Sequence, residues 1–249
     1  APNLKETSPG SIFSDQSWAA RWGRSKDPRK DTCEAEVRWV RDFEPIEWRD
    51  LYSWAAEVDA LGRVAEVLIV DDELGVTTYR VKPADPRGTL SPVDESNLAA
   101  KADSMEGDRW AGAFIDKETE LPEQIGSPLP EGVWLDDDEV RVIEEAEDEF
   151  GAISLLRDIL ARRLLPRSGF KYGTRWRLYE DSVGEDHAPW LLQPEWMAPS
   201  DWAQATLSAR LATGVHKTWL CAFNIDSEWR YLALERPPSE ARWAGFRHK

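Results

Sequence analysis

The feature that most constrains the fold of this 249-residue chain is an internal repeat. Residues 34–81 and 186–235 follow one plan: a short strand, an acidic residue before a tryptophan, a helix ending at a glycine, an apolar strand, an acidic turn and a last strand with a tyrosine. The helix-ending glycines are Gly62 and Gly214. This pattern predicts an α/β chain (α+β with mixed sheets) that is built from two related units.

The second copy carries side chains that can move or stabilise charge without a metal. Tyr179, His187 and Lys217 each lie at the end of a short apolar or aromatic stretch. A phenol, an imidazole and an ammonium are the groups needed to cleave RNA through its own 2′-hydroxyl, since one takes a proton, one gives a proton and one holds negative charge on phosphorus. We expect the adjacent His216 to point to the opposite face of a strand and to take no part.

The first copy keeps the apolar frame without these groups. Aligned by the glycines, Ala65 stands at the position of Lys217, and Glu34 or Ala35 stands near the position of His187. No tyrosine in the first copy can replace the one at the end of the aromatic strand. We therefore predict that the first copy is a structural pseudo-unit and that the second is active.

Composition excludes several classes of protein. No window holds 18 uninterrupted apolar residues, so we expect no membrane span, and the N-terminal residues show no signal pattern. Cys33 and Cys221 are too few and too far apart for a zinc site or a disulfide framework, which favours buried thiols in a cytoplasmic protein. The acidic run at 136–139 is interpreted as a helix N-terminus. We therefore expect no metal and no other cofactor.

The formal net charge of −16 is unfavourable for holding RNA, which is a polyanion. Arginine outnumbers lysine 22 to 9 and the acidic residues are spread along the chain. This composition favours a halophilic protein, with an ordinary acidic mesophilic protein as the alternative. The basic segment 157–177, opposed only by Asp158, is either a phosphate-contacting patch or a solvated helix face. Its Arg167, Lys171 and Arg175 are the candidate RNA-binding residues.

Composition shifts divide the chain into four segments. Residues 1–85 form the incomplete pseudo-catalytic unit, 86–104 have linker composition, 105–168 form a small α+β domain and 169–249 form the catalytic domain. Few residues precede Glu34, so the first unit is either a shortened form or is completed by upstream sequence or by another chain.

The run from residue 169 onward resembles a known family. Its motifs are GFKYG at 169–173, an aromatic strand ending in Tyr179, a His-Ala pair at 187–188 and GVHKT at 214–218. In this order they are similar to the catalytic domain of the archaeal tRNA-splicing endonucleases, up to about residue 235. The resemblance implies two restriction-endonuclease-like units, the second preceded by a small N-terminal domain. Some members of the family fuse a catalytically inactive copy and an active copy in one chain.

The resemblance also implies a function and partners. It implies a metal-independent endonuclease that cuts introns from precursor tRNA at bulge-helix-bulge junctions and leaves 2′,3′-cyclic phosphate and 5′-hydroxyl ends. In the family, an acidic loop inserts into a basic pocket on the opposing catalytic unit. The turn at Asp71, Asp72 and Glu73 looks similar, with a plain solvated hairpin as the alternative. A homodimer, or an assembly with a second endonuclease chain, is expected.

Two other functions stay open at this stage. One is a non-catalytic structural subunit of the same endonuclease, against which the intact set of phenol, imidazole and ammonium argues. The other is an RNA or protein scaffold of the same fold without activity.

Overall fold

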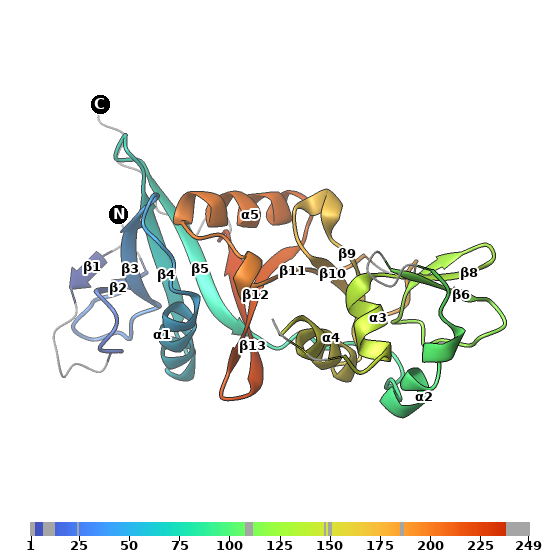
Figure 1. The fold of residues 1–249 in the computed structure, drawn as a ribbon. Coiled ribbons are helices and arrows are strands. Elements are labelled where there is room, and N and C mark those ends of the chain that lie inside the picture. The colour runs from blue at the N-terminus through green and yellow to red at the C-terminus, as the bar shows by residue number, and fades with distance from the viewer. Residues whose placement is uncertain are drawn as a thin grey trace. The chain divides into compact units, whose positions relative to one another are not determined.

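The computed structural model describes residues 3–6, 13–23, 25–107, 112–146, 148, 151–184 and 187–237 (Figure 1). The chain divides into two compact units. Unit 1 comprises Ala1–Asp85 and Leu191–Lys249, and unit 2 comprises Pro86–Trp190. Unit 2 is therefore inserted in the sequence between the two parts of unit 1.

Unit 1 is built on a sheet with the strand order β1-β2-β3-β4-β5-β13-β12-β11. β3 and β4 are parallel, whereas β1–β2, β2–β3, β4–β5, β5–β13 and β12–β13 are antiparallel. Its strands are β1 (Asn3–Glu6), β2 (Ala19–Trp22), β3 (Ala35–Arg41), β4 (Val64–Val70), β5 (Val76–Ala84), β11 (Trp190–Pro194), β12 (Thr218–Ile225) and β13 (Glu228–Glu235). The mixed sheet confirms the predicted fold class.

Helices α1 (Trp48–Ala60) and α5 (Trp202–Gly214) pack on this sheet, α1 on β4 and β5 and α5 on β12 and β13. A 3-10 turn, η3 (Glu195–Met197), precedes α5. Apolar residues recur at helical spacing, so each helix buries one face. The buried residues are Trp48, Leu51, Trp54, Ala55 and Val58 in α1 and Trp202, Ala205, Ala209 and Ala212 in α5. Both copies thus show the predicted order of strand, helix, strand and strand.

The residues that follow the two helices align the copies. Gly62 and His216 both have left-handed backbone, with φ of 68° and 56°. The next residues, Arg63 and Lys217, each donate a backbone hydrogen bond to a carbonyl in the last turn of the preceding helix, at 3.2 and 2.9 Å. The two helix ends therefore have the same geometry.

This geometry corrects the sequence alignment at one position. Arg63, and not Ala65, occupies the position of Lys217, so the prediction that the first copy lacks a cation there is wrong. The turn from Val70 to Val76 is longer than the turn from Ile225 to Glu228. The residue offset that aligns the last strands of the two copies therefore does not align the ends of their helices.

The two copies meet at β5 and β13. Their antiparallel pairing runs from Arg80 opposite Glu235 to Ala84 opposite Tyr231. Because backbone groups of both copies bond across this line, the strands β1 to β5 and β11 to β13 share one continuous sheet within unit 1.

Contacts around the two helices join the copies further. The backbone N–H of Ala203, in the first turn of α5, donates to the carbonyl of Asp42 at 2.8 Å. Trp48 in α1 donates from Nε1 to the carbonyl of Pro199 at 3.0 Å and packs against the ring of Trp219 at a centroid distance of 5.2 Å. Each helix thus finds partners in the other copy for groups that its own copy leaves unpaired.

Two carboxylates in the described part of unit 1 are buried and paired with arginine. Glu66 in β4 is 0% exposed and accepts from Nε and Nη2 of Arg21 at 2.6 Å each, with Arg80 at 3.3 Å. Glu36 in β3 is also 0% exposed and is bound by Nη1 of Arg63 at 2.6 Å. The pair of Arg21 with Glu66 is bidentate, and such pairs are short and strong.

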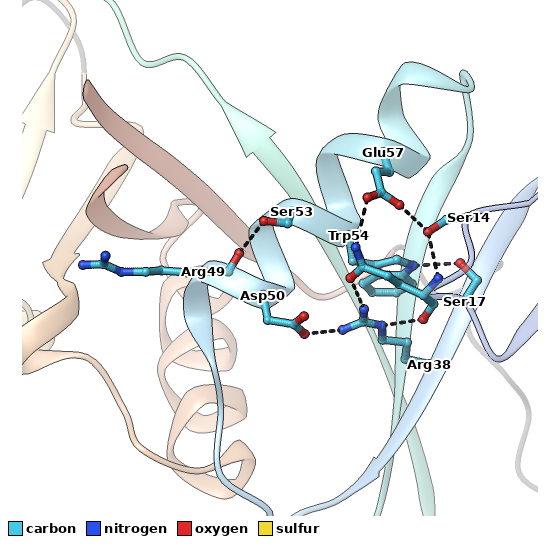
Figure 2. Close-up of polar contacts among 9 residues, drawn as sticks. Ser14, Ser17, Arg38, Arg49, Asp50, Ser53, Trp54 and Glu57 are labelled. Carbon is cyan, nitrogen blue, oxygen red and sulfur yellow. Dashed lines mark hydrogen bonds and ion pairs between the residues drawn. The ribbon is translucent and has the colours of Figure 1, made fainter. Parts of the chain in front are cut away.

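The segment before β2 is tied to α1 by hydrogen bonds of Ser17 with Trp54 and of Ser14 with Glu57 (Figure 2). Ser17 Oγ donates to Glu36 at 2.5 Å and accepts from Trp54 Nε1 at 2.8 Å. Ser14 donates from its backbone N–H to Glu36 at 3.0 Å and from Oγ to Glu57 at 2.6 Å. The pair of Glu36 with Arg63 is therefore closed off from solvent.

Removing one partner of a buried ion pair should lower the free energy of unfolding far more than removing one partner of an exposed ion pair. We expect Glu66→Gln to lower the free energy of unfolding by about 3–5 kcal/mol, because buried Arg21 then keeps only the partly exposed Glu34 as a counter-charge. The matched control is Glu131→Gln, which breaks the exposed pair with Lys117 and should lower it by about 0–1 kcal/mol. Urea unfolding measures both variants, and equal losses would contradict this account.

Unit 2 combines a small sheet, short helices and a two-stranded ribbon. Strands β6 (Ala113–Asp116), β8 (Gly132–Leu135) and β7 (Ser127–Leu129) pair antiparallel in that order, and β9 (Leu165–Ser168) pairs antiparallel with β10 (Trp176–Tyr179). Its helices are α2 (Glu95–Ala99), α3 (Asp137–Ile143) and α4 (Ala152–Ala161), with 3-10 turns η1 (Ala102–Ser104) and η2 (Phe170–Tyr172). A shared core includes Leu98, Ile115, Leu135, Ile143 and Ile153.

The described structure divides the chain differently from its composition. Residues 86–104, with linker composition, contain α2 and η1, and Leu98 is 2% exposed in the core of unit 2. The boundary at Leu191 lies inside the segment 169–249, for which we predict a catalytic domain.

Candidate functional site

Tyr179 is the last residue of β10 in unit 2. It pairs with Leu165 of β9, is 9% exposed and packs with Leu165, Ala188 and Leu90. The alternation in TRWRLY places Trp176 and Leu178 on one face of the strand and Tyr179 on the other. Apolar packing therefore fixes the phenol ring at the end of the strand.

Two arginines lie near this phenol ring. The guanidinium carbon of Arg177 lies 5.6 Å from the ring centroid of Tyr179, and Arg167 stands directly opposite Arg177 in the β9–β10 ladder. Arg177 ends the basic segment 157–177 but is not one of the candidate RNA-binding residues in it. The period of two along β10 is the signal that could have found it, since Arg177 and Tyr179 share a face.

His187 follows the turn after β10 and is exposed. The next residue, Ala188, is 2% exposed and packs in the cluster that holds Tyr179. Ala188 therefore packs beside Tyr179, and the approach of the neighbouring imidazole of His187 to the phenol stays a prediction.

Lys217 belongs to unit 1. It is half-buried and directly precedes β12, whose residues from Trp219 to Phe223 are buried. His216 is exposed and left-handed, so it lies in the helix-end turn and not on a strand as expected. The left-handed backbone of His216, and not strand alternation, sets the direction of its side chain.

The basic segment 157–177 is opposed by more acids than its sequence contains. Arg175 pairs with Asp138, and Asp136 and Asp137 lie 3.8 Å from the same nitrogen. Arg157 pairs with Glu95 at 3.6 Å. The expectation that Asp158 alone opposes this segment is wrong, because α2 and the start of α3 supply acids from distant sequence.

The candidate RNA-binding residues therefore differ in their surroundings. Arg167 donates to the backbone carbonyls of Glu123, Gln124 and Pro166 at 2.9, 3.4 and 2.8 Å. Lys171 is exposed, with its ammonium 5.0 Å from the ring centroid of Tyr172.

The acidic turn between β4 and β5 uses its first carboxylate to shape itself. Asp71 accepts from the backbone N–H groups of Glu73 and Gly75 at 3.1 and 2.6 Å. Asp72 and Glu73 are exposed, and Leu74, with φ of 61°, is 70% exposed. The turn therefore presents two carboxylates and one apolar side chain to solvent.

The acidic run at 136–139 begins α3, as predicted. Asp136 accepts from the N–H of Glu139 at 2.9 Å, and Glu139 accepts from the N–H of Asp136 at 2.9 Å, which is a capping box. Glu139 also accepts from the N–H of Gly126 at 2.7 Å. In the described part of the chain, no three His, Cys, Asp or Glu side chains group as metal ligands would.

Burial raises the pKa of Glu139 from 4.5 to about 7, and the charge of Asp136 adds to this effect. The folded state thus binds this proton more tightly than the unfolded chain does. The stabilisation is complete below about pH 4, near the pKa of an unfolded glutamate, and is lost as the pH rises to about 7.

We therefore expect the free energy of unfolding to fall between pH 5 and pH 8 through this residue. Glu139→Gln, which resembles the protonated form, should flatten that part of the pH profile in urea unfolding. Glu131→Gln, at a side chain 81% exposed, is the control and should leave the profile unchanged. Identical profiles for wild type and Glu139→Gln would refute the assignment.

Neither cysteine has the surroundings of a reactive thiol. Burial raises the pKa of Cys33, and burial raises the pKa of Cys221 well above its usual value. Within the described residues, no helix has the length and apolar character needed to cross a bilayer.

Comparison with known proteins gives a family match and several relatives. Residues 153–231 match the family model for the tRNA intron endonuclease, catalytic C-terminal domain. A tRNA-splicing endonuclease of Thermoplasma volcanium is 32% identical over 168 residues, covering 67% of this chain and 53% of the relative. One of Picrophilus torridus is 26% identical over 201 residues, covering 81% and 63%.

A tRNA-splicing endonuclease of Haloferax volcanii is 26% identical over 243 residues, covering 86% of this chain and 68% of the relative. The chain spans 53% and 63% of the lengths of the Thermoplasma and Picrophilus relatives.

Proposed function

Because residues 153–231 belong to the tRNA intron endonuclease family, as its catalytic C-terminal domain, we propose that this chain cuts precursor tRNA at exon–intron junctions. The observation that carries the proposal is that one continuous family match includes Tyr179, His187 and Lys217. These are the three residues that the chemistry of RNA cleavage singles out in the sequence.

In the proposed reaction Tyr179 takes the proton of the 2′-hydroxyl before the cut. That oxygen attacks the phosphorus, the bond from phosphorus to the 5′-oxygen breaks, and His187 protonates the departing oxygen. Lys217 stabilises the negative charge on the pentacoordinate phosphate. The products are a 2′,3′-cyclic phosphate and a 5′-hydroxyl. Each step uses side chains of this protein, so a metal has no assigned role.

The first copy is proposed to be a pseudo-unit that has lost this chemistry. Its cation at the position of Lys217 is Arg63, whose Nη1 binds the buried carboxylate of Glu36. The ring of Phe13 lies 5.0 Å from the guanidinium carbon of Arg63. A cation paired and covered in this way cannot stabilise a phosphate from outside.

We expect His187→Ala and Lys217→Ala each to lower the single-turnover cleavage rate of a precursor tRNA at least tenfold, with RNA affinity nearly unchanged, because general acid catalysis alone typically contributes about 10²–10⁴-fold. The assay contains EDTA and high salt, and the ends of the products are identified.

The control for this pair is His216→Asn, since asparagine tolerates left-handed backbone and the side chain at this position is exposed. Its rate should equal that of the wild type. A 5′-phosphate product, a strict need for Mg²⁺ in the chemical step, or loss of activity in His216→Asn alone would sink the assignment.

We also propose that two chains assemble. The family substrate has two junctions, and each chain carries one set of candidate catalytic residues, Tyr179, His187 and Lys217. A closed two-fold dimer is the default for identical chains, and a second endonuclease chain is the alternative. The turn with Asp72, Glu73 and exposed Leu74 is the proposed docking element. Ion pairs are screened over about 3 Å at 1 M salt, so the apolar contact of Leu74 matters most if the cytoplasm is salt-rich.

The double variant Asp72→Asn with Glu73→Gln tests this assembly, since it leaves the turn-forming Asp71 intact. We expect the mass from light scattering to fall from dimer to monomer and cleavage to fall with it. The matched control changes two exposed acids of unit 2, Asp103→Asn with Glu106→Gln. A double variant that stays dimeric and fully active would contradict the proposal.

A further inference from the structure

The β9–β10 ribbon places two arginines directly opposite one another. Arg167 pairs with Arg177 in the antiparallel register, so their side chains stand on the same face. Tyr179 lies two residues further along β10, on that face as well. Like charges directly opposite are destabilising in a sheet, so this arrangement calls for a compensating anion.

Arg167 is held rigidly by groups that carry no full charge. Its guanidinium donates to three backbone carbonyls, of Glu123, Gln124 and Pro166. Burial lowers its pKa, and Arg177 lowers it further, although Glu139 and Glu123 act in the opposite direction.

The carboxylates nearest to Arg167 already have other partners. Glu139 accepts from the backbone N–H groups of Gly126 and Asp136, and Glu123 accepts from Ser182 Oγ at 2.8 Å. Arg167 also lines a cavity of about 300 Å³ in unit 2, whose lining residues include neither Arg177 nor Tyr179. The hydrogen bonds of Arg167 to backbone carbonyls make it a preorganised cation.

Arg177 differs from its neighbour Arg175. Arg175 is paired with the acids at the start of α3. Arg177 contacts the ring of Tyr179 at 5.6 Å, and within the described residues its buried Nε has no hydrogen-bond partner. Buried polar groups are normally hydrogen-bonded, so this N–H is available to donate to an acceptor on a ligand.

We propose that Arg177 and Arg167 bind a phosphate group of the RNA strand that is cut, next to the phenol of Tyr179. A guanidinium offers a planar pair of N–H groups that matches two phosphate oxygens. The phosphate would give Nε of Arg177 its acceptor and would offset the repulsion between the two arginines. Its position beside the phenol would hold the adjacent ribose near the group that takes the 2′-hydroxyl proton.

This inference rests on the proposed function, and binding tests it separately from cleavage. The full chain is labelled with ¹⁵N-arginine, and the Nε–H resonances are followed during addition of inorganic phosphate or of a junction RNA with a 2′-deoxy nucleotide at the cut. Arg177→Lys identifies the Arg177 signal by its loss. We expect this signal to shift at lower concentration of RNA than of phosphate.

The exposed Arg230, which pairs with Glu228, is the control and should not shift. An Arg177 signal that moves with neither ligand overturns the subsite. A signal that moves with phosphate and not with RNA overturns the RNA assignment and identifies a small-anion site. If the Arg177 signal shifts with the junction RNA but the wild-type protein does not cut the same RNA with its 2′-hydroxyl present, the proposed function is refuted and the phosphate subsite is kept.

Salt dependence gives a second readout. Losing one phosphate contact should reduce the slope of log affinity against log salt by about 0.7 for a single strand. We expect this change in Arg177→Gln and an unchanged slope in Arg230→Gln. Arg177→Lys should keep the slope with weaker binding, because lysine keeps the charge and loses the paired N–H groups. A wild-type slope in Arg177→Gln would contradict the proposal.

Discussion

The antiparallel pairing of β5 with β13 is the interaction on which the rest of unit 1 depends. It joins a segment that ends at residue 85 to strands that begin after residue 190. Once these strands pair, α1 and α5 lie against one sheet and can exchange contacts, such as the N–H of Ala203 with the carbonyl of Asp42. The start of β12, where Lys217 lies, is thus fixed by contacts with the other copy as much as by its own sequence.

The placement of charge follows one rule in both units: a buried charge is paired, and the pairing decides its role. In the first copy Arg63 is bound to buried Glu36, so its charge serves the fold. In unit 2 Arg175 serves in the same way at the start of α3. Arg177, like Arg157 and Arg236, has a buried Nε without a hydrogen-bond partner in the described structure, and its position beside Tyr179 makes this informative. A strongly acidic chain can thus keep a local cation where an anionic substrate would need one.

The sequence predicts what depends on local pattern. Strand alternation around Tyr179, the capping box at Asp136 and the element order of both copies all follow from neighbouring residues. It does not predict what depends on distant residues or on turn length. The acids that neutralise Arg175 lie in another element. A longer turn between the last two strands of the first copy shifts the alignment, so that Arg63 occupies the position of Lys217. Helix-end geometry, which placed His216 in left-handed backbone, is likewise visible only in three dimensions.

The insertion of unit 2 within unit 1 has a consequence for synthesis of the chain. β5 leaves the ribosome long before its partner β13, because all of unit 2 lies between them in sequence. At about 5–20 residues per second, the delay is on the order of 10 s. Throughout that time β5 is an unpaired edge, which is the kind of surface on which nascent chains aggregate. The strands β11, β12 and β13 are thus made only after the whole of unit 2, and β5 acquires its partner on that side only then.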